Sequence, residues 1–104
     1  MIIVTTNEIA NQNIVEVKGL VQGSTVKAKH VGRDIGASFK TLVGGEIRGY
    51  SDLMKEARTE ALGRMVKEAE NLGANAIVGM RYQTAQVMAG AAEVIAYGTA
   101  VIIE

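Results

Sequence analysis

The chain has 104 residues, and its 11 Lys and Arg balance its 11 Asp and Glu. This balance argues against broad binding to nucleic acids or membrane surfaces through charge. The absence of cysteine excludes disulfides, thiolate metal sites, iron–sulfur clusters and thiol nucleophiles. No apolar run reaches the ~18 residues of a membrane span and the N-terminus lacks a signal-peptide pattern, so we expect a cytoplasmic protein without a membrane partner.

Size and hydrophobicity both favour self-association. A chain of 104 residues predicts a single domain over 1–104, large enough for a core but small enough that oligomerisation would add stability. Apolar residues and glycine together make up more of the sequence than is usual for a soluble domain. Because the surplus apolar surface has to be buried somewhere, the composition favours a homo-oligomer.

The N-terminal quarter predicts two strands. Ile2 to Thr6 is a short β-branched run, and a polar loop over residues 7–12 follows it. Apolar and polar residues then alternate from Asn13 to Lys27, which is typical of a half-buried strand. A strand of this length is expected to bulge or bend at Gly19 or Gly23.

Residues 29–43 change to a helical period. The apolar side chains follow the i, i+4, i+7 and i+8 spacing of a short amphipathic helix: Ile35, Phe39, Leu42 and Val43. Gly44 and Gly45 are expected to end this helix, and Glu46 to Tyr50 to link it to the next one.

A long helix is predicted from Ser51 to Leu72. Good helix formers fill this stretch, and apolar residues recur in it every three or four positions. Ser51 can cap the N–H groups of the first turn, and Gly73 can supply the left-handed residue that stops the helix. Arg58 falls on the apolar face, where a guanidinium is costly unless it snorkels to the rim of the core or binds a ligand.

The C-terminal third predicts two more strands. Side chains alternate from Ala76 to Val87 and from Glu93 to Ile103, and Met88 to Ala92 is expected to connect them through Gly90. The predicted order, β-β-α-α-β-β, is that of an α+β domain with an antiparallel sheet and both helices on one face. The other face still carries apolar side chains, so we expect a second copy to cover it.

The stretch from Gly44 to Ser51 is the most suggestive one for a ligand. Its glycines, carboxylate, cation and phenol precede a helix N-terminus, which suits an anion. Asp52 favours a purely structural turn, because it already occupies the positive end of the helix dipole. Neither a phosphate-loop nor a dinucleotide-binding fingerprint matches. The candidate ligand-binding residues are Gly44, Gly45, Glu46, Arg48, Tyr50 and Arg58.

Other polar residues give weaker signals. His30 is the sole histidine, so a metal site built on it would need symmetry-related copies. Glu56 and Glu60 lie one helical turn apart and could serve acid–base or metal chemistry. Arg64, at i+4 from Glu60, favours a solvated helix face instead. The local basic cluster lacks aromatic residues that stack on bases, apart from one phenylalanine that the short helix needs, so no nucleic-acid partner is expected. Its members are Lys27, Lys29, His30, Arg33 and Lys40.

Several short motifs together resemble the YbjQ family of small bacterial proteins. They are Gly44-Gly45-Glu46 with Tyr50, Glu56-Ala57-Arg58 followed by Ala61, Leu72-Gly73-Ala74-Asn75-Ala76, and Tyr97-Gly98-Thr99-Ala100-Val101. The likeness extends over nearly the whole chain, from Thr5-Thr6 to Val101.

The resemblance implies a dodecin-like α+β subunit in a ring-shaped homo-oligomer, a pentamer. It also implies heavy-metal binding, which is the label of that family. The residues support this label poorly, because heavy metals favour thiolate and imidazole ligands. We therefore assign no metal ligand and no cofactor from the sequence, and a metal is expected from the resemblance only.

Three hypotheses about function remain. The first is a non-enzymatic homo-oligomer that binds a small ligand, an ion or a partner protein. The second is an enzyme whose site lies between subunits and uses Glu46, Tyr50 and Arg58. The third is a purely structural scaffold. The absence of a nucleophile–base pair and of a metal-ligand motif favours the first and the third hypotheses over the second.

Overall fold

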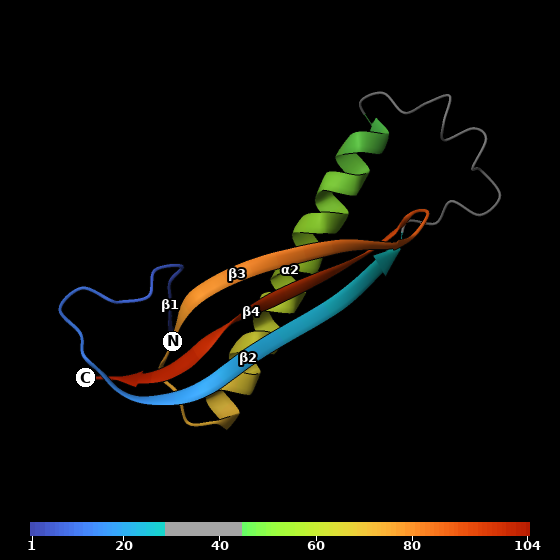
Figure 1. The fold of residues 1–104 in the computed structure, drawn as a ribbon. Coiled ribbons are helices and arrows are strands. Elements are labelled where there is room, and N and C mark those ends of the chain that lie inside the picture. Colours follow the sequence, from blue (N-terminus) through green and yellow to red (C-terminus); the bar gives the residue numbers. More distant parts are fainter. Residues whose placement is uncertain (29–44) are drawn as a thin grey trace.

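The computed structural model describes residues 1–28 and 45–104, without the side chains of residues 45–48. Along the chain its elements are β1 (Ile2–Ile3), β2 (Ile14–Ala28), α2 (Gly45–Asn71), β3 (Ala76–Met88) and β4 (Ala91–Ile103). Figure 1 shows long, curved strands and a single helix that runs along them. Within the described ranges, no helix combines the length and the apolarity that crossing a membrane requires.

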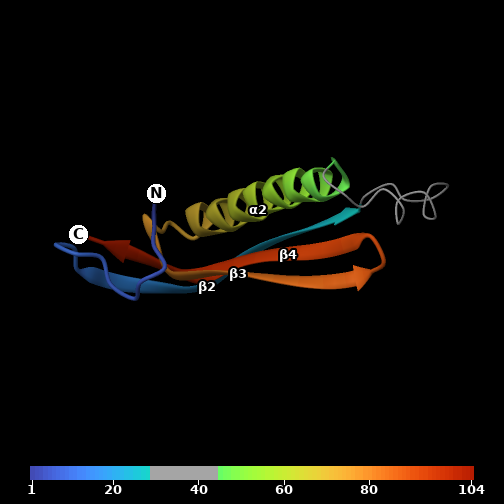
Figure 2. The same ribbon diagram turned by 90° about the horizontal axis from the view of Figure 1, so that it is seen from above.

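The strands form one mixed sheet in the order β1-β3-β4-β2. β4 lies between β2 and β3 and is antiparallel to both. β1 is parallel to β3, with Ile2 opposite Ala76 and Ile3 opposite Ile77. α2 covers one face of the sheet, mainly over β2 and β4 (Figure 2). The chain is therefore a two-layer α+β fold.

The main core lies between α2 and the sheet. Four residues of α2 recur at four-residue spacing and are fully buried: Ala57, Ala61, Met65 and Ala69. They pack with Val21 of β2 and with Val94, Ala96 and Ala100 of β4. Because most of these side chains are small, the helix can lie close to the strands. A Cβ at Gly23 would collide with the backbone of Ala61 and Met65, so α2 crosses β2 at this glycine.

A smaller core lies on the opposite face, at the end of the sheet that holds both termini (Figure 1). Ala76, Val78, Val101 and Ile103 are buried there, and Val4 and Ile9 pack against them. Main-chain hydrogen bonds hold the N-terminal segment in place: Gly79 donates to Thr6 (2.8 Å) and Met80 to Val4 (3.0 Å). At this end β3 and β4 are therefore covered on both faces, whereas Val17 on β2 stays 63% exposed.

The predicted fold class is wrong in its helices and in its sheet. The described residues contain one helix, in the order β-β-α-β-β, and the sheet is mixed instead of antiparallel. The first strand does not form a hairpin with β2. Residues 4–13 instead pass across the end of the sheet, where Asn13 bonds to Glu104, so β1 lies on the far side beside β3. The helix predicted over residues 29–43 lies outside the described residues.

The long helix starts earlier than predicted. α2 begins at Gly45, so the predicted link from Glu46 to Tyr50 is helical and Ser51 does not cap the helix. The residues of that link are compatible with a helix, and glycine is tolerated at a helix start. The predicted stop is confirmed, because α2 ends at Asn71 and Gly73 adopts a φ of +81°.

Two predicted strand features are also confirmed. Gly19 has a φ of +117°, and the pairing of β2 with β4 shifts between Val17 and Gly19, as expected for a bulge. The hairpin between Met88 and Ala91 turns through Gly90, whose φ is 78°.

Candidate functional site

The stretch from Gly44 to Ser51, which the sequence predicts as a ligand-binding loop, is helical from Gly45 onward. Gly44 lies outside the described residues, and Gly45, Glu46 and Arg48 belong to the first turns of α2. In a helix, only the first four N–H groups lack an intrahelical partner, and the later ones bond to carbonyls four residues back. The prediction of an interhelix turn is therefore wrong. Main-chain N–H groups beyond residue 48 are not available to bind an anion.

Tyr50 and Arg58 both lie on α2, eight residues apart. Both are half-buried. At ~1.5 Å per residue they are about 12 Å apart along the helix axis. The predicted enzyme site with Glu46, Tyr50 and Arg58 is therefore spread along one helix within a subunit.

Tyr50 lines a cleft between the first half of α2 and the β3–β4 hairpin. The cleft has a volume of about 290 Å³. Small hairpin residues lie opposite the apolar helix residues, and Lys27 and Gln86 add polar groups. Its lining is Lys27, Tyr50, Leu53, Met54, Gln86, Gly90, Ala91 and Ala92. A cleft of this size and chemistry suits a small, mainly apolar molecule.

Lys27, which lines this cleft, links β2 to α2 through ion pairs with two glutamates. Its Nζ lies 2.9 Å from Glu60 Oε1 and 3.5 Å from Glu56 Oε1. The hydroxyl of the buried Thr25 donates to Glu60 Oε2 at 3.0 Å. The bond from Lys27, followed by the bond from Thr25, lowers the pKa of Glu60, and the bond to Glu60 raises the pKa of Lys27. Both pKa values move away from neutrality, which suits a fixed ion pair better than a proton-transfer group.

The sequence patterns do not predict this ion cluster. They place Lys27 in a basic cluster, whose other members lie outside the described residues, and make Arg64 the partner of Glu60. Arg64 instead donates to the Ser24 carbonyl on β2. A usable signal was present, because Thr25 and Lys27 continue the period-two series that faces the helix.

A second hollow, about 670 Å³ in volume, lies over the N-terminal loop. Hydroxyl, amide and apolar groups line it together with one carboxylate, Glu8. Asn11 shapes this loop with a φ of 64°. The lining brings together no cation and no nucleophile–base pair, so it offers no recognisable catalytic chemistry.

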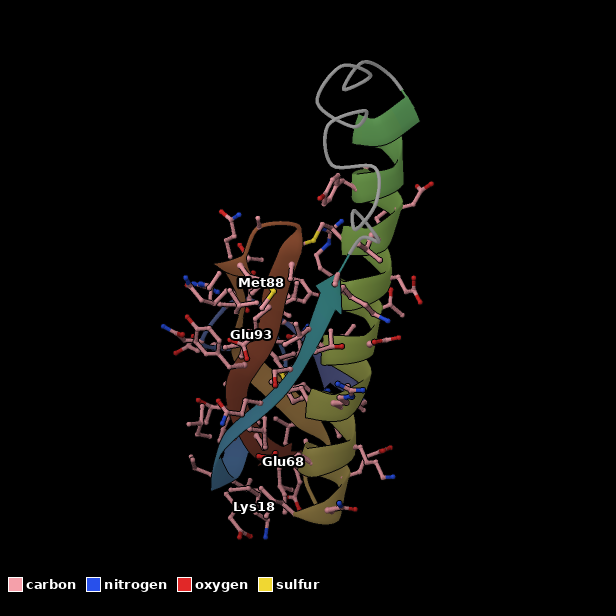
Figure 3. The ribbon with its side chains drawn as sticks, turned by 90° about the vertical axis from the view of Figure 1, so that its right-hand side faces the viewer. Lys18, Glu68, Met88 and Glu93 are labelled. Atoms are coloured by element: carbon pink, nitrogen blue, oxygen red, sulfur yellow. The ribbon has the colours of Figure 1, made fainter. Side chains whose placement is uncertain are left out.

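Apolar side chains are exposed on the face of the sheet that α2 leaves uncovered, which we call the open face. It consists of Val17, Leu20, Gln22, Ser24 and Val26 on β2 and their partners on β4. Val17, Leu20 and Val26 are 63%, 65% and 56% exposed. Figure 3 shows Glu93, the partner of Val26, on the side of the sheet away from α2. Large apolar side chains exposed together on one face are typical of interaction surfaces.

The described side chains offer poor metal ligands. Among them, no three His, Cys, Asp or Glu come together in a group that could hold a metal ion. Glu56 and Glu60 do approach each other, but the Lys27 ammonium already lies between these carboxylates. A cation bound there would have to displace it.

Known proteins resemble this chain over its whole length. A family model named YbjQ, with the description "Putative heavy-metal-binding", matches residues 1–104. UPF0145 proteins from Clostridioides difficile and Halalkalibacterium halodurans are 59% and 61% identical over 104 residues, which is all of this chain and 93% and 98% of theirs. The Thermotoga maritima protein of the same name is 55% identical over the same residues and 98% of its own length.

A solved structure supports the fold. It is the crystal structure of a protein of unknown function from Pediococcus pentosaceus, described as a member of the DUF74 family. The TM-score is 0.62 at 23% identity, and the match covers 100% of this chain and 98% of that one. At this identity the likeness concerns the fold alone.

The label of the family model and the described side chains disagree. Soft metals favour thiolate and imidazole ligands, the chain has no cysteine, and Lys27 already forms ion pairs with both carboxylates of the described pair. The resemblance itself is confirmed by the match from end to end and by relatives that are more than half identical. The chain belongs to the YbjQ family, as its relatives among the bacterial UPF0145 proteins also indicate.

Proposed function

We propose that this protein is the subunit of a homo-oligomer that acts as a binding or assembly module and not as an enzyme. The observation that carries the proposal is the open face, where Val17, Leu20 and Val26 are all more than half exposed. Burial of a large aliphatic side chain is worth about 1.5–3 kcal/mol. Covering this face would therefore stabilise an assembly considerably.

The shape of the subunit supports the same proposal. Its extents are 55 × 22 × 16 Å and its radius of gyration is 17.4 Å. A compact chain of ~100 residues has a radius of gyration of about 13 Å. The long sheet thus exceeds what a single helix can cover, and further copies are the simplest cover.

The family resemblance implies a ring of five subunits, and we adopt that number in the proposal. A ring requires heterologous contacts, in which the open face of one copy meets a different surface of the next. The charge chemistry favours a non-enzymatic role, because the pKa values of Glu60 and Lys27 move away from neutrality. We also propose that the assembly is cytoplasmic.

Native mass spectrometry of the untagged protein, purified without chelators, tests the assembly. A ring of five would have a mass of about 55 kDa, five times the chain mass of 11.0 kDa. The double substitution Leu20→Lys and Val26→Lys should break the ring into smaller species. Thr59→Lys, at an exposed position of α2, is the matched control and should keep the ring. A monomeric wild-type protein, or an intact ring in the double variant, would contradict the proposal.

The cleft beside Tyr50 supports the ligand part of the proposal. Its 290 Å³ suit a small apolar molecule, which would appear in the same spectra as a reproducible mass excess. Ala92→Leu should fill the cleft and remove the excess without changing the subunit number. A wild-type protein without any mass excess would argue against tight binding and for the scaffold hypothesis.

A further inference from the structure

The N-terminal segment borders β3 through main-chain hydrogen bonds only as far as Met80. β1 pairs with Ala76 and Ile77, and the following residues bond to β3 as far as Met80. Arg81 then donates to the carbonyl of Thr5 at 2.8 Å. From Tyr82 to Met88 every residue is exposed, and none of the described strands pairs with the outer side of this segment. We call residues 82–88 the bare edge.

The bare edge lacks the usual protection against pairing with another chain. An unpaired edge presents main-chain N–H and C=O groups, and natural proteins blunt such edges with charged side chains, proline, bulges or short strands. The sequence from Tyr82 to Met88 contains no charged residue, proline or glycine. Its one irregularity is the shift in pairing with β4 between Gln86 and Met88. The edge is therefore suited to accept another strand.

The opposite edge of the sheet, β2, is protected. Arg64 reaches from α2 to the Ser24 carbonyl. Lys18 pairs with Glu16 at 2.7 Å on the same strand, and Lys27 is bound to Glu60. A neighbouring strand would have to displace Arg64 and pass these charges. The described part of the chain thus has one long edge suited to pairing, and not two complementary ones.

We infer that the bare edge pairs antiparallel with the bare edge of a second copy, around a two-fold axis at Ala85. A single edge of this kind can be satisfied by an identical one only in an isologous contact, where both copies use the same surface. Ala85 is the middle of the segment, so centring the axis there pairs all of it. We call this contact the two-fold seam.

The side chains are compatible with this register. Tyr82 would lie opposite Met88 of the partner subunit, Thr84 opposite Gln86 of the partner subunit, and Ala85 opposite itself. Polar side chains such as these can hydrogen-bond across strands. Tyr82 shares the helix side of the sheet with Ala96, whereas Met88, beyond the shift in pairing, shares the side of Glu93 with Ala91. The seam would therefore cover part of each side chain on opposite faces, and these side chains are 41% and 67% exposed in the single subunit. No like charges meet within it.

The seam uses a different surface from the open face and rests on the proposed function only for its subunit count. Rings of five formed through the open face would be joined in pairs by seams, which gives ten subunits. Without rings, the seam would give dimers. The number of subunits therefore tests the two proposals separately.

A single engineered cysteine can trap the seam. The chain contains no cysteine, so any disulfide has to come from the introduced residue. At a position facing itself across antiparallel strands, Cβ atoms lie about 4.5–5.5 Å apart, near the ~3.5–4.5 Å that a disulfide needs. Ala85→Cys should therefore form a disulfide-linked dimer under mild oxidation.

The matched control is Ser24→Cys, an exposed position on the protected β2 edge, which should stay uncrosslinked. Absence of an Ala85→Cys dimer would overturn the seam. Mixed disulfides between the Ala85→Cys and Ser24→Cys variants would also overturn it, because they would place β3 against β2 of the neighbour.

Opposite charges provide a second test that does not depend on one variant folding well. Ala85 lies opposite Glu93 in the sheet, so Ala85→Glu would crowd carboxylates at the axis and should abolish pairing. Mixing Ala85→Glu with Ala85→Lys should restore pairing, because each contact would join opposite charges. Failure of the mixture to restore it, with both variants folded by circular dichroism, would contradict the register.

Native mass spectrometry of wild type and Ala85→Glu separates the two proposals. A wild type of ten subunits and a variant of five support both. A wild type of five overturns the seam and leaves the ring. A wild-type dimer with a monomeric variant supports the seam and overturns the ring. A monomeric wild type overturns both.

Discussion

The two halves of β3 differ sharply in their surroundings. From Ala76 to Met80 the strand is almost entirely buried, whereas from Arg81 to Met88 every residue is exposed. The first half contacts cores on both faces of the sheet and is bordered by the N-terminal segment. The second half has β4 on one side and little else among the described elements.

This difference indicates which part of β3 is covered by other segments of the same chain. The buried half is rich in apolar residues, including Ile77 and Val78, and Gly79 adopts a φ of +63° beside the N-terminal segment. The exposed half mixes polar residues such as Gln83 and Gln86 with apolar ones such as Ala85 and Val87. The chain itself therefore covers the first half of β3. We propose that neighbouring copies cover the second half.

The largest expected effect is at the crossing of α2 over β2. Gly23→Ala places a Cβ against the backbone of Ala61 and Met65, which cannot move without shifting the helix. Overpacking a core usually costs about 1–3 kcal/mol and sometimes more, so we expect a loss of at least about 3 kcal/mol. Denaturant unfolding measures it. A loss below about 1 kcal/mol would contradict the close approach of helix and strand, since such a small cost requires room for the methyl group.

A matched pair of truncations tests the comparison of covered and exposed halves directly. Met65 is fully buried and Met88 is 67% exposed. Met65→Ala should lower the free energy of unfolding by about 2–5 kcal/mol. Met88→Ala should change it by less than about 0.5 kcal/mol in the dissociated subunit. Dilution to monomers before unfolding separates folding from assembly. Equal losses at the two sites would contradict the difference in cover.

The link from Lys27 to Glu60 predicts a pH dependence. The pKa of Glu60 is lowered in the folded state, so its contribution is complete above its ordinary pKa of 4.5 and is lost as pH falls through the folded value. The pKa of Lys27 is raised, so its contribution is complete below its ordinary pKa of 10.5 and is lost as pH rises through the folded value.

Thermal unfolding across pH checks this prediction. Glu60→Gln should lower the melting temperature at neutral pH and flatten its decline in acid, while Glu56→Gln, at the longer contact of 3.5 Å, should change less. Identical acid limbs for wild type and Glu60→Gln would show that the ion pair does not carry the dependence.

The sequence predicted the elements whose signals are local. The body of α2 and the strands of the hairpin follow from periodicity, and Gly73 and Gly90 from their turn chemistry. The placement of β1 is not a local property. It depends on hydrogen bonds from Ile2 and Val4 to residues more than 70 positions away, which alternation in a short strand cannot reveal.

The candidate site was predicted less well for a related reason. Two adjacent glycines normally indicate a break, so the sequence predicts a turn after Gly44, whereas α2 begins at Gly45. Lys27 was assigned to a basic patch because its acidic partners are about 30 residues away in sequence. Tertiary pairing with α2 decides the position of Lys27, and the sequence signals it only through the period-two series of Thr25 and Lys27.

The smallest expected effect concerns Gly63, which lies on the outer side of α2. A Cβ there would meet nothing within 4 Å in the single subunit, and glycine inside a helix costs about 1 kcal/mol relative to alanine. Gly63→Ala should therefore stabilise the dissociated subunit by about 0.5–1 kcal/mol and leave the assembly intact. If this variant were stabilised as a monomer but failed to assemble, the backbone of a neighbour would have to approach α2 at Gly63. The ring contact would then include the outer surface of the helix, which is a candidate for the unidentified surface that meets the open face.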